Sequence, residues 1–331
     1  MRLSILDQSP ISKGYTAQQA LLASLKLAQA GEQFGYQRYW IAEHHNFHGL
    51  TCPAPEVMLS YIGANTSTIR IGAGAVLLPH YKPYRIAETY NLLATLFPDR
   101  IDLGIGRAPG GSAEAAMALS DNFLANVQKM PDMITELLHF LHNDHPFEHM
   151  FSKISASPIP EKLPVPWILG TSEKSARLAA GNGTSYAFGH FMSDKNGPEI
   201  INTYRKQFKP SKKQQKAEVI IAVSVICAET TDKAEELALP VLFWRIQNAK
   251  GEGDKGVPTL EETQLYFSKD DRKQILKEAK KKMIIGDPIT VKLALKQLQE
   301  SHGADEVMVV TITHRYEDRI KSYKLLANEM I

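Results

Sequence analysis

Two adjacent histidines, His44 and His45, follow an apolar run in the sequence Trp40-Ile-Ala-Glu-His-His. An imidazole can accept or donate a proton near neutral pH, so this pair could serve general acid–base chemistry. If the run is a β-strand, neighbouring side chains point to opposite faces, and only one histidine can face a given pocket. For His45 we favour the role of a hydrogen-bonded structural histidine. Adjacent strand residues do not converge on one ion, so we expect no metal site at Glu43-His44-His45.

A second group of candidates suits ligand binding. Gly74 lies within an apolar run at 70–78, and glycine in a strand often allows a ligand to approach the backbone closely. Close packing of a helix on the strand is the alternative role for this small residue. Arg107 follows another apolar run and carries a permanently charged, planar fork that suits an anionic group. A surface ion pair with Asp102 or Glu114 is the alternative for Arg107.

The stretch Gly170-Thr171-Ser172 with Ser175 is a candidate anion site at a strand–helix junction. Backbone N–H groups at a helix N-terminus attract phosphate, and the three hydroxyls add further donors. The alternative is an ordinary helix N-cap. We place three further polar residues at strand ends, where they are candidates to line a pocket: Gln8, His190 and His314. Gly104-Ile-Gly106 lacks the spacing of a dinucleotide-binding fingerprint.

These candidates need a scaffold that gathers strand ends in one place. Buried strands are predicted at 2–6, 38–42, 70–78, 101–106, 166–170, 186–190, 218–228 and 306–313. Helices are predicted at 17–34, 55–65, 83–96, 119–141, 172–181, 198–208, 232–248, 287–302 and 317–329. Eight strand–helix pairs favour an α/β fold, a single-domain (β/α)8 TIM barrel over 1–331, and a doubly wound open sheet is the main competitor. Residues 249–283 break the alternation, and we predict an insertion near the seventh helix that acts as a lid.

Composition limits the classes of partner. The chain has 331 residues and 38 Lys and Arg against 36 Asp and Glu, and a net charge of +2 favours neither nucleic acid nor an anionic membrane. Its longest apolar run, at 219–228, is too short to span a bilayer. Two cysteines, Cys52 and Cys227, offer no disulfide framework, and the N-terminus has no apolar signal core. We expect a cytoplasmic enzyme with a small-molecule substrate.

Several of these segments, in their order and spacing, resemble the bacterial luciferase-like monooxygenase family, and in particular its single-chain, non-luminescent members. The segments are Trp40-Ile-Ala-Glu-His-His45, Gly72-Ala-Gly-Ala-Val-Leu-Leu-Pro79, Asp102-Leu-Gly-Ile-Gly-Arg107, Trp167-Ile-Leu-Gly-Thr-Ser-Glu-Lys-Ser175, Ile285-Gly-Asp-Pro and Gly303-Ala-Asp-Glu-Val-Met-Val-Val310. The resemblance covers nearly the whole chain and is weakest at 142–164 and 249–283. It implies a (β/α)8 barrel that binds reduced FMN, supplied by a separate flavin reductase, and uses O2 to oxidise a small organic substrate.

The resemblance also implies roles for single residues. His44 matches the position that takes part in the chemistry of oxygen on reduced flavin, so we expect His44 to be the catalytic residue. Gly74 and Ala75 match a cis peptide bond under the flavin ring. Gly170, Thr171, Ser172 and Ser175 match the phosphate site, and Arg107 and His190 are expected to bind the cofactor too. Some luciferases carry cysteine where Gly106 stands, which argues against luminescence but not against flavin binding.

Three alternatives stay open: a deazaflavin-dependent dehydrogenase on the same fold, a non-catalytic flavin-binding protein, and a metal-dependent hydrolase built on Glu43-His44-His45. The resemblance further implies a homodimer that forms through the second and third helices. Apolar residues there could serve that contact or face the barrel: Val57, Met58, Tyr61, Leu92 and Leu93.

Overall fold

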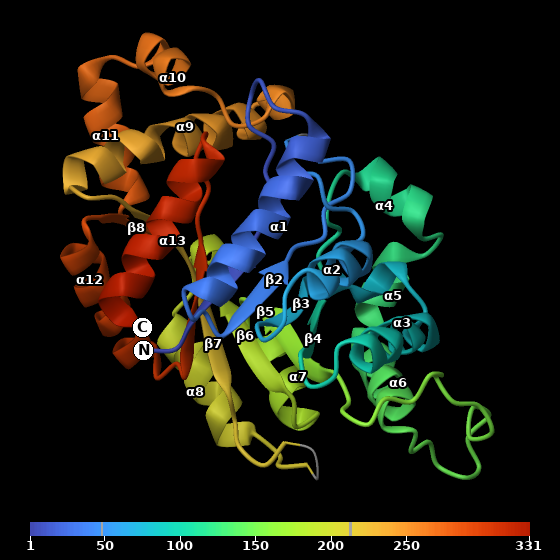
Figure 1. Cartoon of the computed structure of the whole chain (residues 1–331). Coiled ribbons are helices and arrows are strands. Elements are labelled where there is room, and N and C mark those ends of the chain that lie inside the picture. The colour runs from blue at the N-terminus through green and yellow to red at the C-terminus, as the bar shows by residue number, and fades with distance from the viewer. Residues whose placement is uncertain (48, 212–213) are drawn as a thin grey trace.

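A closed barrel of eight parallel strands forms the centre of the molecule (Figure 1). The computed structural model describes residues 1–47, 49–211 and 214–331. The strands of the described chain are β1 Leu3–Asp7, β2 Arg38–Ile41, β3 Arg70–Leu77, β4 Ile101–Gly106, β5 Val165–Gly170, β6 Ser185–Gly189, β7 Val219–Cys227, β8 Met283–Gly286 and β9 Glu306–Val310, and all of them except β8 belong to the barrel. Strands β1 to β7 pair in chain order, and β9 closes the ring between β7 and β1. The predicted TIM barrel is therefore confirmed.

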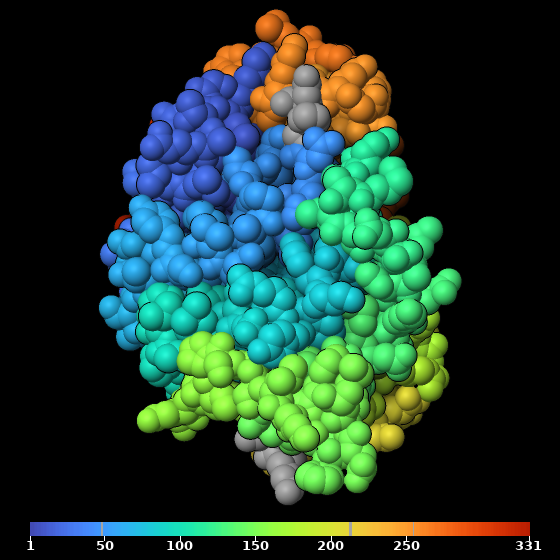
Figure 2. Space-filling view, turned by 90° about the vertical axis from the view of Figure 1, so that its right-hand side faces the viewer, coloured from blue at the N-terminus to red at the C-terminus, as the bar shows by residue number. Residues whose placement is uncertain are grey.

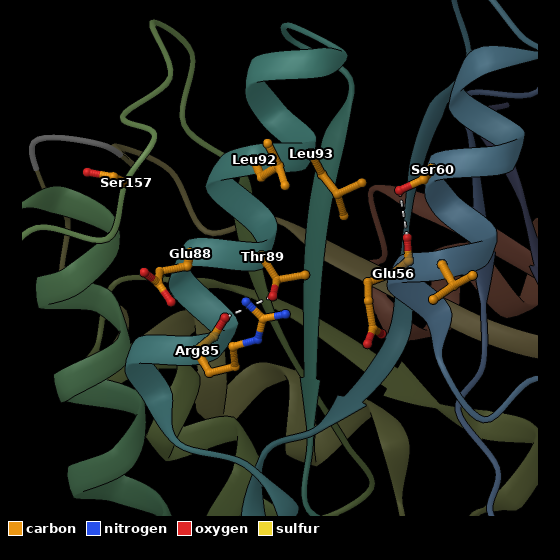
Figure 3. A pocket seen from close by; sticks show the side chains of 9 residues that line it. Glu56, Ser60, Arg85, Glu88, Thr89, Leu92, Leu93 and Ser157 are labelled. Atoms are coloured by element: carbon orange, nitrogen blue, oxygen red, sulfur yellow. Dashed lines mark hydrogen bonds between the residues drawn. The ribbon is translucent and has the colours of Figure 1, made fainter.

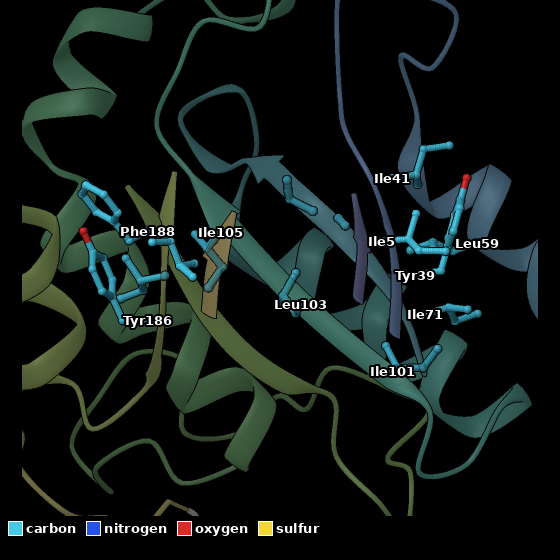
Figure 4. Close-up of a cluster of buried hydrophobic side chains, with 14 of the residues drawn as sticks. Ile5, Tyr39, Ile41, Leu59, Ile71, Ile101, Leu103, Ile105, Tyr186 and Phe188 are labelled. Carbon is cyan, nitrogen blue, oxygen red and sulfur yellow. The ribbon is translucent and has the colours of Figure 1, made fainter. Parts of the chain in front are cut away.

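The barrel strands are buried on both faces, because they pack inward against each other and outward against helices. Leu6, Trp40 and Trp167 belong to the cluster inside the barrel. Neighbouring residues such as Ile5 and Tyr39 point outward and pack against the helical layer. In Figure 4 these two side chains lie beside Leu59 of the second helix. Apolar residues on both faces of the strands thus give one core inside the barrel and another around it.

The helices surround this barrel and carry the capping residues that their ends require. Their bounds are α1 Ala17–Gln33, α2 Pro55–Ala64, α3 Pro83–Leu96, α4 Ala113–Leu119, α5 Phe123–Gln128, α6 Met130–His142, α7 Glu173–Gly181, α8 Gly197–Gln207, α9 Thr231–Ala249, α10 Leu260–Tyr266, α11 Lys269–Ala279, α12 Pro288–His302 and α13 Tyr316–Met330. Thr16 caps α1 with a reciprocal box to Gln19, and Asp287 caps α12. The termini meet at one edge, where the Met1 amino group donates a hydrogen bond to the Met330 carbonyl.

Two predicted elements differ from the structure, and one observed strand was not predicted. The single helix expected at 119–141 is three helices, α4 to α6, and Pro131 stands in the first turn of α6, where its missing N–H is tolerated. The last strand, expected to reach 313, ends at Val310, because the Thr311 N–H donates to the Tyr323 hydroxyl instead of the sheet. β8 was not predicted; it pairs only with the end of β7, a contact that local sequence does not reveal.

The segment after β7 combines α9 with the residues that interrupt the predicted alternation. α12 contacts β7, β9 and the neighbouring helices α8 and α13, and α9 also contacts β7 and β8. α9 packs with α10 and α11 at the upper end of the molecule in Figure 1. Its far end reaches the loop after β2, where the Trp244 ring lies against Gly49. Val257 then exchanges backbone hydrogen bonds with the β1–α1 loop at Ile11 and Lys13. The segment therefore spans from β7 to the loops after β1 and β2.

A buried ion network closes the opposite, N-terminal end of the barrel. The Arg38 guanidinium donates to the carboxylates of Asp102 and Glu306 at 2.8–2.9 Å. Arg70 and the Trp40 indole N–H also donate to Asp102. Burial raises the pKa of the Asp102 carboxyl, but Arg38, Arg70 and these hydrogen bonds outweigh it, and the pKa lies below its usual value. The network therefore forms a charged layer at the N-terminal end of the barrel, next to its apolar interior.

In the described residues, no helix has the length and apolar character needed to cross a membrane.

Candidate active site

A cavity of about 480 Å³ opens at the C-terminal ends of the barrel strands. This volume lies in the usual range for small-molecule and cofactor sites. Its lining includes nearly every residue that sequence reasoning selected: Gln8, His44, Gly74, Ala75, Arg107, Gly170, Thr171, Ser172 and Ser175. These residues come from the ends of β1 to β5, which a parallel barrel brings to one mouth. The rest of the wall is mostly apolar and includes Leu77, Phe188, Phe191 and Met192.

The two adjacent histidines have different surroundings. His45 Nε2 lies 2.7 Å from a Glu43 carboxylate oxygen. Glu43 also accepts hydrogen bonds from the Leu77 N–H at 3.0 Å and the Tyr81 hydroxyl at 2.8 Å. His45 is therefore the structural histidine that we expected. Because these bonds occupy Glu43, the trio does not present three free ligands, and no metal-binding group of three such residues is found in the described parts of the chain.

His44 lines the cavity and carries an unsatisfied polar atom. Its backbone N–H donates to the Cys52 carbonyl at 2.9 Å, but its buried Nδ1 has no hydrogen-bond partner in the described chain. Burial, with a smaller contribution from His45, lowers the pKa of His44 to about 4. At neutral pH, His44 is an uncharged imidazole with a free nitrogen, which is an arrangement suited to a bound ligand.

Small residues shape the surface beside His44. The peptide bond between Gly74 and Ala75 is cis, as the family resemblance implied. A Cβ on Gly74 would lie 2.6 Å from Leu6 Cδ1, inside the barrel. Gly74 therefore makes room for interior side chains below the cavity, not for an outer helix. A Cβ on Gly106 would lie 3.0 Å from Ala75 Cβ, which also lines the cavity, so the wall stays flat only with glycine there.

Arg107 is exposed and lines the cavity. Asp102, the suggested ion-pair partner, is buried between Arg38 and Arg70 at the other end of β4. Among the described residues, Arg107 has no hydrogen bond or ion pair, so the surface ion pair with Asp102 or Glu114 is not formed. A guanidinium at a cavity wall without a protein partner is available to an anionic ligand.

The phosphate-site candidates form both a helix cap and part of the cavity wall. Ser172 is the N-cap of α7, its hydroxyl accepts from the Ser175 N–H, and Ser175 Oγ donates to the Ser172 carbonyl at 2.6 Å. Ser172 and Ser175 therefore do form an ordinary helix cap on α7. Both residues nevertheless line the cavity together with Gly170 and Thr171, and the first-turn N–H groups of a helix lack intrahelical partners. An anion can therefore bind at this junction, on the wall of the cavity that Arg107 also lines.

Two of the three other polar candidates lie outside the cavity. Gln8 lines it, but His190 does not, and its ring packs edge-on against His302 at 5.4 Å between centroids. The prediction that His190 binds the cofactor is thus not supported, because the chain turns into a short 3-10 helix at that residue. His314 lies within hydrogen-bond distance of the Val257 carbonyl. Sequence reasoning missed Phe191 and Met192, whose only signal was their place just after β6.

Comparisons with known proteins agree with this geometry. The family model for luciferase-like monooxygenases matches residues 1–306. A luciferase-like monooxygenase of Escherichia coli K12 is 34% identical over 326 residues, which are 97% of this chain and 95% of that protein. The chain belongs to the luciferase-like monooxygenase family. Another relative, the N-acetyl-S-alkylcysteine monooxygenase of Bacillus subtilis, is 33% identical over 333 residues and covers 100% of this chain and 98% of its own.

Several solved structures share the fold of this chain. The crystal structure of apo-MsnO8 has a TM-score of 0.88 and 31% identity, and covers 99% of this chain and 98% of that chain. The oxygenating constituent of 3,6-diketocamphane monooxygenase from Pseudomonas putida, in complex with FMN, has a TM-score of 0.72 and 20% identity over 99% of this chain and 97% of that chain. An F420-dependent secondary alcohol dehydrogenase in complex with an F420–acetone adduct has a TM-score of 0.72 and 14% identity, and the match covers 100% of this chain and 99% of that chain. At such identities the last two show the fold alone.

Proposed function

We propose that the protein is a cytoplasmic FMN-dependent monooxygenase that uses reduced flavin and O2 to oxidise a small organic substrate. The observation that carries the proposal is the cavity itself. It joins a buried, unpaired imidazole nitrogen, a guanidinium without a protein partner and a helix N-terminus rich in hydroxyls. The names of the monooxygenase relatives support oxygen chemistry, and a separate flavin reductase would supply reduced FMN.

The residues of the cavity fit a flavin mononucleotide. Arg107, Thr171, Ser172 and the first turn of α7 would hold its phosphate, and the flat wall at Gly74–Ala75 would face its ring. The bound flavin would supply the activation of oxygen. His44 Nδ1 would exchange a hydrogen bond or a proton with the reacting groups, because no residue of the described chain competes for it. The segment from α9 to β8, anchored on the β1–α1 loop, would shield this chemistry from water.

We expect Arg107→Gln to weaken FMN binding about 10- to 100-fold, because a hydrogen bond to a charged group contributes about 1.5–3 kcal/mol. The same change should leave riboflavin binding unaltered, since riboflavin has no phosphate. Anaerobic titration of reduced FMN and of reduced riboflavin, followed by flavin absorbance, measures both. Arg177→Gln is the matched control, because Arg177 is an exposed arginine on α7 that pairs with Glu173.

Three results of these titrations would count against the proposal. Equal losses for FMN and riboflavin would remove Arg107 from the phosphate site. Binding of deazaflavin without FMN would favour the dehydrogenase on the same fold. Absence of all flavin binding would overturn the proposed function.

We further propose a homodimer that forms through α2 and α3. These helices, blue to cyan, occupy the centre of the face seen in Figure 2. Val57, Tyr61 and Leu92 are 65%, 45% and 49% exposed, whereas Met58 and Leu93 are buried and face the core. Figure 3 shows the groove between the two helices, which the exposed Leu92 borders. Exposed apolar residues gathered on one face are typical of a subunit contact.

Leu92→Glu should convert the dimer into a monomer, because it would bury two unpaired carboxylates in a two-fold symmetric contact. Light scattering coupled to gel filtration gives the mass of each species. Leu265→Glu is the control, because Leu265 is 88% exposed and lies on α10, not on α2 or α3. A wild-type protein that runs as a monomer at micromolar concentration would contradict the dimer.

A further inference from the structure

Gln8 is a polar residue of the cavity wall that has no role in the site described so far. It directly follows β1, whose Leu6 belongs to the cluster inside the barrel and lines the same cavity. Side chains alternate along a strand, so Gln8 faces the interior as Leu6 does. Among the described residues, the Gln8 side chain forms no hydrogen bond. Its amide therefore offers one carbonyl acceptor and two N–H donors to a ligand in the cavity.

The backbone next to Gln8 has an unfavourable conformation. Ser9 has a φ of 49° and is fully buried. The other non-glycine residues with positive φ in the described chain are Asn46, Asp99 and Asn143, and asparagine and aspartate tolerate this conformation better than serine does. A residue in such a conformation persists where the surrounding structure enforces it, and these residues cluster at functional sites.

The contacts of Ser9 enforce its conformation. Its N–H donates to the buried Asp7 carboxylate at 2.6 Å, and its hydroxyl accepts a hydrogen bond from the Ser24 hydroxyl at 2.9 Å. The Ser9 carbonyl accepts hydrogen bonds from the N–H and the hydroxyl of Thr51, at 3.1 Å and 2.8 Å. Asp7 is itself held by an ion pair with the buried Arg319 of α13. The residue before Ser9 therefore enters the cavity from a fixed point of the backbone, which lowers the entropic cost of binding a ligand there.

Strand register places Gln8 on the same row as the flat wall of the cavity. Asp7 pairs with Ile41, and Ile41 pairs with Ala73. The row that follows these pairs consists of three residues that all line the cavity: Gln8, Ala42 and Gly74. The two outer members of that row are two strand spacings apart, about 10 Å, with only the small alanine side chain between them. A flat ring that lies on the β3 wall can therefore reach the Gln8 amide with one edge.

The chemistry of a flavin ring decides which edge suits Gln8. One edge carries an imide, in which an N–H donor stands between two carbonyl acceptors, and the opposite edge carries two methyl groups. A glutamine amide complements the imide, because its carbonyl accepts from the N–H and its own N–H donates to a carbonyl. The methylated edge suits the apolar wall at Phe188, Phe191 and Met192, which lies on the β6 side of the cavity.

We propose that Gln8 binds the imide edge of the flavin ring and thereby fixes the orientation of the ring in the cavity. This inference rests on the proposed function, which places a flavin there with its phosphate at Arg107 and α7. The phosphate on the side of β4 and β5, the ring on β3 and the imide at β1 follow the order of the strands around the barrel.

The test compares reduced FMN with reduced 3-methyl-FMN, in which a methyl group replaces the imide N–H, by anaerobic titration of the full-length protein. We expect the wild type to bind FMN about tenfold or more tightly than the methylated analogue. Gln8→Met keeps a similar length but has no amide, so it should weaken FMN binding about 5- to 50-fold and bring the ratio of the two affinities close to one. Gln18→Met, an exposed change on α1, is the matched control and should behave as the wild type. Circular dichroism of each variant verifies that it is folded.

The two ligands separate this inference from the proposed function. If the wild type binds FMN and 3-methyl-FMN equally, or if Gln8→Met keeps the full preference for FMN, the inference is overturned and the proposed function stands. If the wild type binds no flavin, the proposed function is overturned and the inference with it. A deazaflavin carries the same imide, so binding of deazaflavin alone, with a Gln8-dependent preference over its 3-methyl derivative, would overturn the proposed function and support the assignment of Gln8.

Discussion

Replacement of His44 by alanine should lower the rate of oxygen-dependent product formation by about 100-fold or more, with FMN still bound. General acid–base groups contribute about 10²- to 10⁴-fold to catalysis. His44 has the position for that role, because its side chain lines the cavity and its buried Nδ1 has no partner in the described chain. The side chain makes no hydrogen bond to the described residues, so the loss should fall on turnover and not on folding.

The measurement is the rate at which a substrate, found by screening small organic compounds with the wild-type protein, is oxidised with reduced FMN and O2. His190→Ala is the matched control, because His190 also follows a barrel strand but packs on His302 outside the cavity. Since the pKa of His44 is about 4, the imidazole is neutral above about pH 5. The pH profile of the wild type should therefore show no inflection from His44 between pH 6 and 8. A His44→Ala variant with the wild-type rate would remove the residue from the mechanism.

Arg38→Met should destabilise the protein by about 3–5 kcal/mol, which is the usual effect of removing one partner from a buried ion pair. Arg38 joins Asp102 and Glu306, and both carboxylates are fully buried. Without the guanidinium, Glu306 would keep, among the described residues, one side-chain hydrogen bond, which it accepts from the Ser4 hydroxyl. For a chain of this length the loss corresponds to a fall in Tm of about 4–7 °C.

Thermal and urea unfolding, followed by circular dichroism, would measure this effect. Arg177→Met provides the comparison, because the Arg177–Glu173 pair is more than half exposed and its loss should change Tm very little. Trp40 connects the network to the cavity, since its indole N–H donates to Asp102 and its ring lines the pocket. We therefore expect Arg38→Met to weaken FMN binding at temperatures near its lowered Tm. A change in Tm equal to that of Arg177→Met would show that the ion network around Arg38 contributes no net stability.

The barrel and the polar residues of the cavity wall followed from local sequence patterns. Strand runs with apolar residues on both faces indicate burial on both sides, and eight of them alternating with helices leave few topologies besides a closed parallel barrel. In that topology every strand ends at the same mouth. His44, Arg107 and Ser175 could therefore be placed in one site from their positions after strands, without any knowledge of contacts. The helix starts at Thr16 and Asp287 could also be predicted from local sequence, because an N-cap side chain accepts hydrogen bonds from the first turn of its own helix.

Tertiary structure alone decided the features that depend on distant segments. The bond from Arg38 to Glu306 joins residues 268 positions apart, and the Trp244 ring lies against Gly49 because α9 extends toward the loop after β2. Helical periodicity predicts a helix but does not say where that helix lies. The protonation state of His44 likewise depends on how deeply its neighbours bury it. Local sequence patterns determine the strands, their ends and the helix caps, whereas burial and pairing between distant residues arise only in the folded chain.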